Sequence, residues 1–176
     1  RTNVGLYSTH RQGRPYSYGM DNFTHGAVPT WNDYYLLYVP ESPNDPNVVF
    51  DSRFPIDEFF ACADSKGLKR GAFTSRNDQD SEWFSKLDLK ISQQIPAFRD
   101  GDYLELYAVI RNLTNLLDDS KGVFREASFP RRENVVRAVY NDDGKYYYSR
   151  FYGSNDSTLV NRPSQYLIKI GFDYKF

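Results

Sequence analysis

The residue types that most often carry catalysis or bind metals are few in this chain, and their spacing brings none of them together. His10 and His25 have neither the H-E-x-x-H spacing nor the cysteine partners of a zinc site. Cys62 is the single cysteine, so no internal disulfide can form. Asp118 and Asp119 lack the twelve-residue pattern of a calcium loop and are better explained as turn residues. We therefore expect no enzyme, no metal and no cofactor.

An aromatic cluster is the pattern best suited to ligand contact. It comprises Tyr146, Tyr147, Tyr148 and Tyr152. Aromatic side chains in loops offer a large contact area to sugars or apolar cargo at low entropic cost. Arg131, Arg132 and Arg137, a little earlier in the chain, could clamp an anionic ligand or a lipopolysaccharide phosphate. Packing of two loops against each other and a solvated basic loop explain the same residues, so both interpretations stay open.

The composition limits the classes of function. The 176 residues carry a net charge of -1, which offers no basic field for nucleic acid. With 40% hydrophobic and 26% charged residues, the chain has no run of about 18 apolar residues, so a helical membrane protein is excluded. A membrane β-barrel remains possible because only alternate residues of each strand face lipid.

The last thirteen residues, 164–176, alternate between apolar and polar side chains without a break. One face would carry Tyr166, Ile168, Ile170, Phe172, Tyr174 and Phe176. The other would carry Leu167, Lys169, Gly171, Asp173 and Lys175. A soluble sandwich strand has the same period, but strands of 9–11 residues are typical of a membrane barrel, whereas ordinary strands average about 5–6.

Three further alternations predict an all-β fold. With the C-terminal strand, we expect strands near 3–11, 83–98, 103–113 and 164–176, joined by a tight turn at 99–102 and by long connections at 13–81 and 114–163. Long and short connections alternate when one rim of a barrel faces outside and the other faces the periplasm. Four strands cannot close a barrel, so we interpret the chain as an open part of one and as a C-terminal fragment of a longer protein.

The two long connections are expected to be structured extracellular loops. Residues 55–66 suit one short helix, with Pro55 at its first position and Gly67 just past its end. Residues 135–140 and 145–152 flank Asn141-Asp-Asp-Gly144, which predicts a hairpin. Connections of this length are uncommon unless they are structured or functional.

Two sets of motifs resemble a known family. The spacing Lys169-x-Gly-x-x-Tyr-x-Phe176 resembles the C-terminal β-signal of bacterial outer-membrane proteins, whose residues here are Lys169, Gly171, Tyr174 and Phe176. From Trp83 onward, the order of Lys86 to Pro96, Leu104-Glu-Leu-Tyr107, Asn112-Leu-Thr-Asn115 and Phe129-Pro130 resembles the C-terminal end of TonB-dependent receptors, most closely the Oar-like group with a carboxypeptidase-regulatory-like domain. Asn112-Leu-Thr-Asn115 has Thr where the family more often has Phe.

The resemblance implies an energy-coupled transporter in the bacterial cell outer membrane, moving an unknown cargo. Family members have a barrel of roughly 22 strands blocked by an N-terminal plug. The implied partners are outer-membrane lipid, the barrel-assembly machinery, and TonB through a plug that this chain lacks.

Two other classes of function stay open. An outer-membrane barrel enzyme would need a Ser/His or Asp/His constellation, and both histidines lie in the first segment. A secreted soluble β-domain that binds carbohydrate would need a second apolar layer over the long strands, for which the sequence supplies few spare strands.

Overall fold

The computed structural model describes residues 1–22, 35–129 and 131–176, and its regular structure is mostly β-strand. The fold is therefore all-β, as the alternations predict. His25, part of the 13–81 connection, and Pro130 of the Phe129-Pro130 motif lie outside the described residues. The chain divides into two units: the sheet unit (1–13, 82–126 and 159–176) and the loop unit (14–81 and 127–158).

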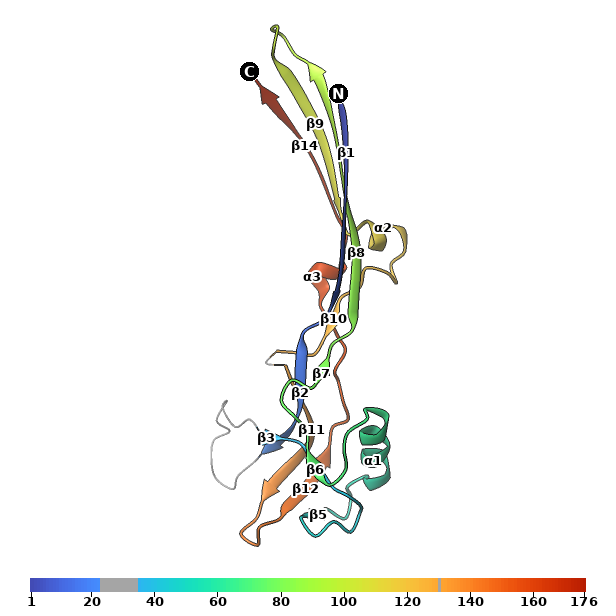
Figure 1. Ribbon diagram of the computed structural model, residues 1–176, viewed down its shortest axis with the longest axis vertical. Coiled ribbons are helices and arrows are strands. Elements are labelled where there is room, and N and C mark those ends of the chain that lie inside the picture. The colour runs from blue at the N-terminus through green and yellow to red at the C-terminus, as the bar shows by residue number, and fades with distance from the viewer. Residues whose placement is uncertain (23–34, 130) are drawn as a thin grey trace. The chain divides into compact units, whose positions relative to one another are not determined.

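The sheet unit is built on four long antiparallel strands in the order β1, β8, β9, β14 (Figure 1). They are β1 (Thr2–Gln12), β8 (Trp83–Pro96), β9 (Tyr103–Arg111) and β14 (Leu167–Lys175). Both chain ends lie at the same end of this sheet as the β8–β9 turn (Figure 1). The four strands occupy the four segments in which the sequence alternates.

The strand ends differ from the expected ones by a few residues, for local reasons. β8 stops at Pro96, which has no N–H to donate to a neighbouring strand. A turn follows in which the Ala97 N–H donates to the Asp102 carbonyl at 3.1 Å and Gly101 has a φ of 97°. β9 stops before Asn112, whose φ of 54° is left-handed and ends the extended chain.

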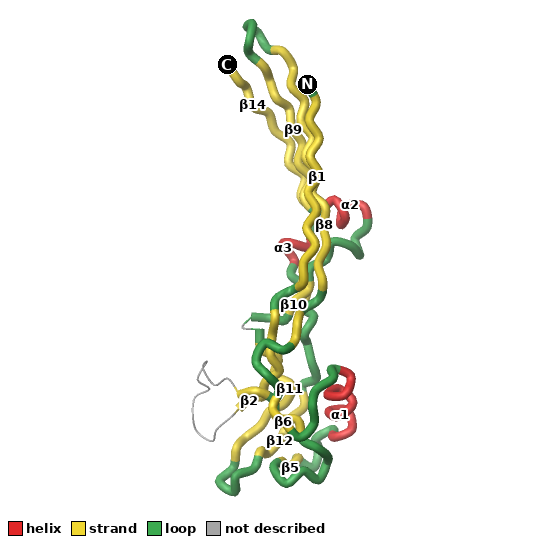
Figure 2. The backbone as a smooth tube through the Cα atoms, viewed as in Figure 1, coloured by secondary structure: helices red, strands yellow, loops and turns green. Residues whose placement is uncertain are grey.

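Two short helices in the sheet unit were not expected: α2 (Leu113–Leu117) and α3 (Asn161–Ser164) (Figure 2). The sequence analysis predicted one helix, so the predicted number of helices was wrong. Buried Asn112 accepts from the Asn115 N–H and donates Nδ2–H to the Gly122 carbonyl at 2.8 Å. Gly122 has a φ of 61°, and a Cβ there would lie 2.1 Å from Asn112 Oδ1. The Asn-Leu-Thr-Asn motif thus caps α2 at the end of β9.

The loop unit contains a sheet that the sequence analysis did not foresee. Its main strands pair in the order β3, β2, β11, β12, β5, with β7 beside β2, and β4 pairs with β6 separately. The β11–β12 pair is the predicted hairpin, whereas β2 with β11 and β5 with β12 are parallel. The strands are β2 (Pro15–Asn22), β3 (Tyr35–Leu36), β4 (Tyr38–Val39), β5 (Val48–Phe50), β6 (Ala72–Phe73), β7 (Gln79–Asp80), β11 (Arg132–Tyr140) and β12 (Tyr146–Phe151). The remaining short strands are β10 (Arg125–Glu126) and β13 (Thr158–Leu159).

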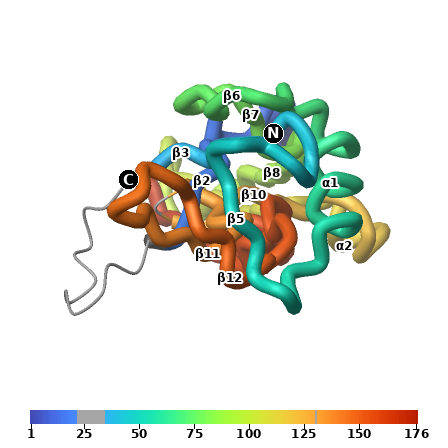
Figure 3. The backbone as a smooth tube through the Cα atoms, turned by 90° about the horizontal axis from the view of Figure 1, so that it is seen from below, coloured from blue at the N-terminus to red at the C-terminus, as the bar shows by residue number. Residues whose placement is uncertain are grey.

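The helix α1 (Ile56–Ser65) covers one side of the loop-unit sheet (Figure 3). It buries Phe59, Phe60 and Ala63 in an aromatic core shared with the strands. Phe59 and Tyr148 are both 0% exposed, with ring centroids 6.0 Å apart. The predicted loop helix is confirmed, and the loop unit has two layers around one core.

Candidate functional site

Strand register places the apolar side chains of all four long strands on one face of the sheet unit. Ile91 of β8 lies opposite Val4 of β1 and Ala108 of β9, and Ala108 lies opposite Ile170 of β14. Because paired residues share a face, each alternation extends the apolar face of its neighbour. This apolar face also includes Leu6, Ile168, Phe172, Tyr174, Leu89, Ile95, Leu104, Leu106 and Ile110.

The apolar face is open. Ile170 is 83% exposed, Phe172 69% and Val4 67%. Ile170 and Phe172 lie in the middle of β14, where a soluble sheet would be covered by a second layer. A continuous apolar surface of this kind is rare on a soluble monomer and marks a surface that meets lipid or another protein.

The opposite face of the sheet unit is polar. Lys86 donates to Asp88 at 2.9 Å, and the Lys90 ammonium lies 5.9 Å from the centre of the Tyr107 ring. Lys169 and Asp173 of β14 lie on this face as well, because they alternate with Ile168, Ile170 and Phe172. The two faces therefore match the lipid side and the lumen side of a membrane strand.

The strand β8 is long enough to cross a bilayer core. From Trp83 to Ile95 on β8 there are about 12 residue steps, or roughly 40 Å of strand, which at a tilt of about 40–45° spans about 30 Å. The hydrocarbon core of a bilayer is about 30 Å thick. Trp83 stacks on His10 at the far end of this strand, with ring centroids 4.8 Å apart. An aromatic at that position is typical of a membrane interface.

No helix in the part of the chain that the structure describes is long and apolar enough to cross a membrane.

The four residues of the β-signal motif occupy both faces of β14. Lys169 and Gly171 are on the polar face, where Gly171 pairs with Tyr107. A Cβ on Gly171 would lie 2.5 Å from the Tyr107 hydroxyl, so the ring rests directly on the glycine. Tyr174 donates its hydroxyl hydrogen to Asp102 in the β8–β9 turn, and Phe176 is exposed just past the strand end. The glycine of the motif thus makes room for a neighbouring tyrosine.

The structure corrects one member of the aromatic loop cluster. Tyr148 is fully buried and donates to the Tyr38 carbonyl at 2.5 Å, so it is a core residue and not a surface contact for a ligand. Burial also raises the pKa of the Tyr148 phenol well above its usual range. Successive residues of a strand point to opposite faces, so Tyr148 points into the core and its neighbour Tyr147 points away from it.

The other tyrosines of the cluster differ from one another. Tyr146 is half-buried and stacks on Tyr38 at 5.9 Å between ring centroids. Tyr147 donates its hydroxyl hydrogen to Asp51 at 2.8 Å. Tyr152 is partly exposed and donates to Asp21 at 2.8 Å. The structure therefore does not bring the four tyrosines together as one stacking platform.

A polar network in the loop unit has no counterpart in the sequence analysis. Asp156 accepts hydrogen bonds from Lys66 at 2.5 Å, Tyr18 at 2.7 Å and Tyr16 at 2.9 Å. Burial raises the pKa of Asp156. The hydrogen bonds from these donors lower the pKa by more than burial raises it, so the pKa of Asp156 is below its usual value. Burial raises the pKa of Tyr16 to about 12. Asp156 lies in a Ser-Asn-Asp-Ser segment that reads as an ordinary polar turn, so no local signal marks it.

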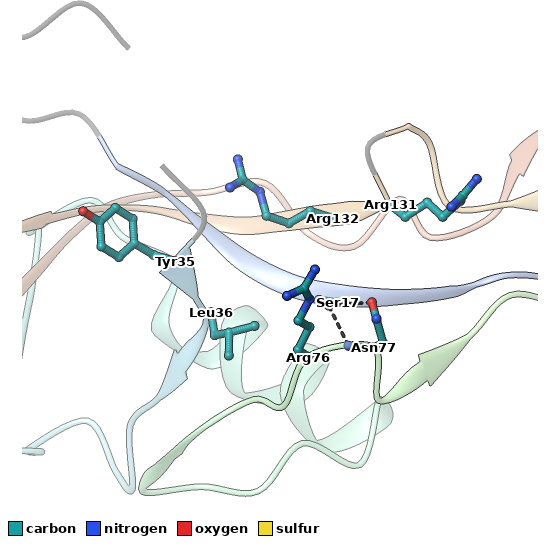
Figure 4. A pocket seen from close by; sticks show the side chains of 7 residues that line it. All are labelled: Ser17, Tyr35, Leu36, Arg76, Asn77, Arg131 and Arg132. Carbon is teal, nitrogen blue, oxygen red and sulfur yellow. Dashed lines mark hydrogen bonds between the residues drawn. The ribbon is translucent and has the colours of Figure 1, made fainter. Parts of the chain in front are cut away.

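Arg131 and Arg132 line a cavity of about 470 Å³ in the loop unit. Arg76, which the sequence analysis did not single out, lines the same cavity from another segment (Figure 4). The remaining lining residues are Ser17, Tyr35, Leu36 and Asn77. Two of the three predicted arginines are therefore in one site, which does not include the tyrosines of the cluster. The third, Arg137, pairs with Asp21 at 3.4 Å instead.

Comparison with known proteins identifies no relative for this fold. No family model matches the chain, and neither a curated protein nor a solved structure matches it.

Proposed function

We propose that this chain forms part of the wall, including the closing strand, of an outer-membrane β-barrel of the TonB-dependent, Oar-like kind, and that it serves energy-coupled transport of an unidentified cargo. In this proposal the protein is not an enzyme. The apolar face contacts outer-membrane lipid, the polar face lines the lumen, and the loop unit is extracellular. TonB acts through a plug, and the barrel-assembly machinery engages β14.

One observation carries the proposal: the apolar face shared by β1, β8, β9 and β14, which is exposed at Ile170 and Phe172 and is formed by strands of 9 to 14 residues, the length that a tilted membrane strand needs. Burying an apolar side chain is favourable by about 1.5–3 kcal/mol, so exposure of this face to water would be unfavourable. β1 and β14 are edge strands, and further strands pairing with them would remove those edges, as a barrel does.

The membrane assignment is tested by cysteine labelling. In a Cys62→Ser background, Ile170→Cys and Lys169→Cys place a thiol on opposite faces of β14 at adjacent residues. With the protein in isolated outer membranes, a charged maleimide should label position 169 from the lumen and leave position 170 protected by lipid. Equal labelling of the two positions would refute the proposal.

The assembly role of the motif is tested by deleting Phe176. We expect a marked fall in the amount of full-length protein in the outer membrane, measured by fractionation, because the terminal aromatic completes the β-signal. Phe98→Ala, which removes another fully exposed aromatic near the same end of the sheet, is the matched control and should assemble normally. Unchanged assembly without Phe176 would count against the signal.

The soluble carbohydrate-binding alternative is weakened by the same apolar face. That alternative requires a second layer over Ile170 and Phe172, and none of the described residues provides one. Among the residues that the structure describes, nothing favours the barrel-enzyme alternative over a transporter.

A further inference from the structure

The cavity lined by Arg76, Arg131 and Arg132 concentrates positive charge in the loop unit. Arg132 is the first residue of β11 and Arg131 directly precedes it, whereas Arg76 lies on the segment between β6 and β7 (Figure 4). None of the seven described residues that line the cavity is acidic. Three arginine side chains thus line one cavity, and the described part of its lining contains no carboxylate.

Two of the three arginines have no acidic partner within the described residues. Neither Arg76 nor Arg131 makes an ion pair or side-chain hydrogen bond there, although the loop unit pairs Arg53 with Asp51, Arg70 with Asp64 and Arg137 with Asp21. The N–H donors of an arginine need oxygen acceptors, which carboxylates or phosphates supply. The cavity therefore attracts an anion.

The local backbone holds these side chains in place. Arg132 lies against Gly19, where an added Cβ would come within 2.8 Å of the arginine Cδ. The Ser17 hydroxyl accepts from the Asn77 N–H at 2.7 Å, which ties the segment carrying Arg76 to β2. The Ser17 N–H donates to the Arg131 carbonyl at 3.1 Å, so β2 also holds Arg131. Contacts with β2 thus position all three arginines.

The arrangement indicates more than one anionic group in the ligand. The guanidinium groups of Arg131 and Arg132 point apart, and Arg76 comes from a different wall (Figure 4). Guanidinium groups arranged in this way suit a ligand with more than one anionic group. The volume of about 470 Å³ is also in the range of small-molecule sites, and Tyr35 and Leu36 add an apolar part to the lining.

We propose that this cavity binds a small molecule that carries two phosphate groups, for which sugar bisphosphates serve as the probes. Phosphate is favoured over carboxylate because a phosphate monoester carries more charge and accepts bidentate bonds from arginine. The ligand has two possible sources, a soluble sugar bisphosphate or the phosphorylated sugar headgroup of a lipid. The inference goes beyond the transport proposal and does not require it, since it concerns the loop unit alone.

Calorimetric titration of the whole chain in detergent tests the proposal. The soluble source is represented by fructose 1,6-bisphosphate, with fructose 6-phosphate and fructose as matched probes. The lipid source is represented by a glucosamine disaccharide bisphosphate without acyl chains, with the unphosphorylated disaccharide as its control. We expect at least one bisphosphate to bind about tenfold more tightly than its probe with fewer phosphates, and the tighter of the two identifies the source. Absence of binding by both bisphosphates, or equal affinity regardless of phosphate number, overturns the proposal.

Substitutions assign the binding to the cavity. Arg76→Gln and Arg131→Gln should each weaken bisphosphate binding about tenfold. Arg76→Lys, which keeps the charge but loses the bidentate geometry, should have a smaller effect. Arg53→Gln changes a highly exposed arginine elsewhere in the loop unit and should bind like the parent protein. A loss in Arg53→Gln equal to that in Arg76→Gln overturns the assignment, and the labelling of positions 169 and 170 reports on the membrane proposal separately.

Discussion

The strands β14 and β12 both point successive side chains to opposite faces, but these faces meet opposite surroundings. In β12 the inward residue, Tyr148, is 0% exposed beneath α1 and its neighbouring aromatics. In β14 the apolar residue Ile170 is 83% exposed. Alternation therefore reveals which residues share a face, whereas the element that covers that face comes from elsewhere in the chain or from outside it.

The two units consequently gain their stability in different ways. The loop unit buries its aromatics between a sheet and a helix, so its core is complete within the described residues. The sheet unit leaves a full apolar face open and relies on backbone pairing between long strands. Such a sheet needs lipid or a partner to recover the hydrophobic free energy that its own chain does not supply.

The largest effect should come from opening the loop-unit core. Phe59→Ala should lower the free energy of unfolding by about 3–5 kcal/mol, because it removes a fully buried ring and leaves a cavity. Phe129→Ala removes an exposed phenylalanine of the same unit and should change stability by less than about 0.5 kcal/mol. Urea unfolding followed by near-ultraviolet circular dichroism measures both, and equal losses would mean that the core is misplaced.

A charge on the apolar face should have the next largest effect. In lipid, Ile170→Arg should destabilise the sheet by about 2–4 kcal/mol, since the guanidinium would be at mid-membrane depth. Lys169→Arg, on the polar face one residue away, should be near neutral. Unfolding from lipid vesicles compares the two, and similar effects would contradict the assignment of faces.

A smaller effect should follow from crowding the glycine beneath Tyr107. Gly171→Ala should cost about 1–3 kcal/mol, because the new Cβ displaces the tyrosine ring. In a Tyr107→Ser background the same substitution should cost much less, and unfolding of the four proteins forms a double-mutant cycle. If the two substitutions have additive effects, the ring does not rest on the glycine.

The smallest effect concerns acid and the Asp156 network. Since the folded pKa of Asp156 is lowered, its contribution to stability is present above pH about 4 and is lost as the pH falls further. Burial raises the pKa of Glu133, so protonation of that carboxyl stabilises the folded state as the pH falls toward this range and opposes the loss. Asp156→Asn should cost about 1 kcal/mol at neutral pH and flatten the acid limb in urea titrations. An unchanged acid limb in Asp156→Asn would exclude Asp156 as its source.

Local signals in the sequence predicted much of the sheet unit and part of the loop unit. Long alternations located the four strands, and the Asn-Asp-Asp-Gly turn located the β11–β12 hairpin, because both depend on residues close in sequence. The parallel pairing of β2 with β11 was missed because it joins segments more than 100 residues apart. The inward orientation of Tyr148 was missed for a related reason, since three successive tyrosines carry no polarity difference that marks the buried one.

The candidate sites follow the same division. The sequence pointed to Arg131 and Arg132, which are adjacent, but Arg76 joins them only because contacts with β2 bring a distant segment to the same cavity. The sequence identified Gly171 as a motif residue. Its contact with the Tyr107 ring became known only from the register of β9 and β14.

By itself, then, the sequence determined the period of each strand, the residues that share a face and the positions where the chain must turn, because these follow from the geometry of neighbouring residues. Only the tertiary structure decided that the apolar face of β14 stays open, that Tyr148 is covered, and that three arginines line one cavity. The physical reason is that burial and charge clustering depend on contacts between segments far apart in the chain, and local pattern carries no information about which segments meet.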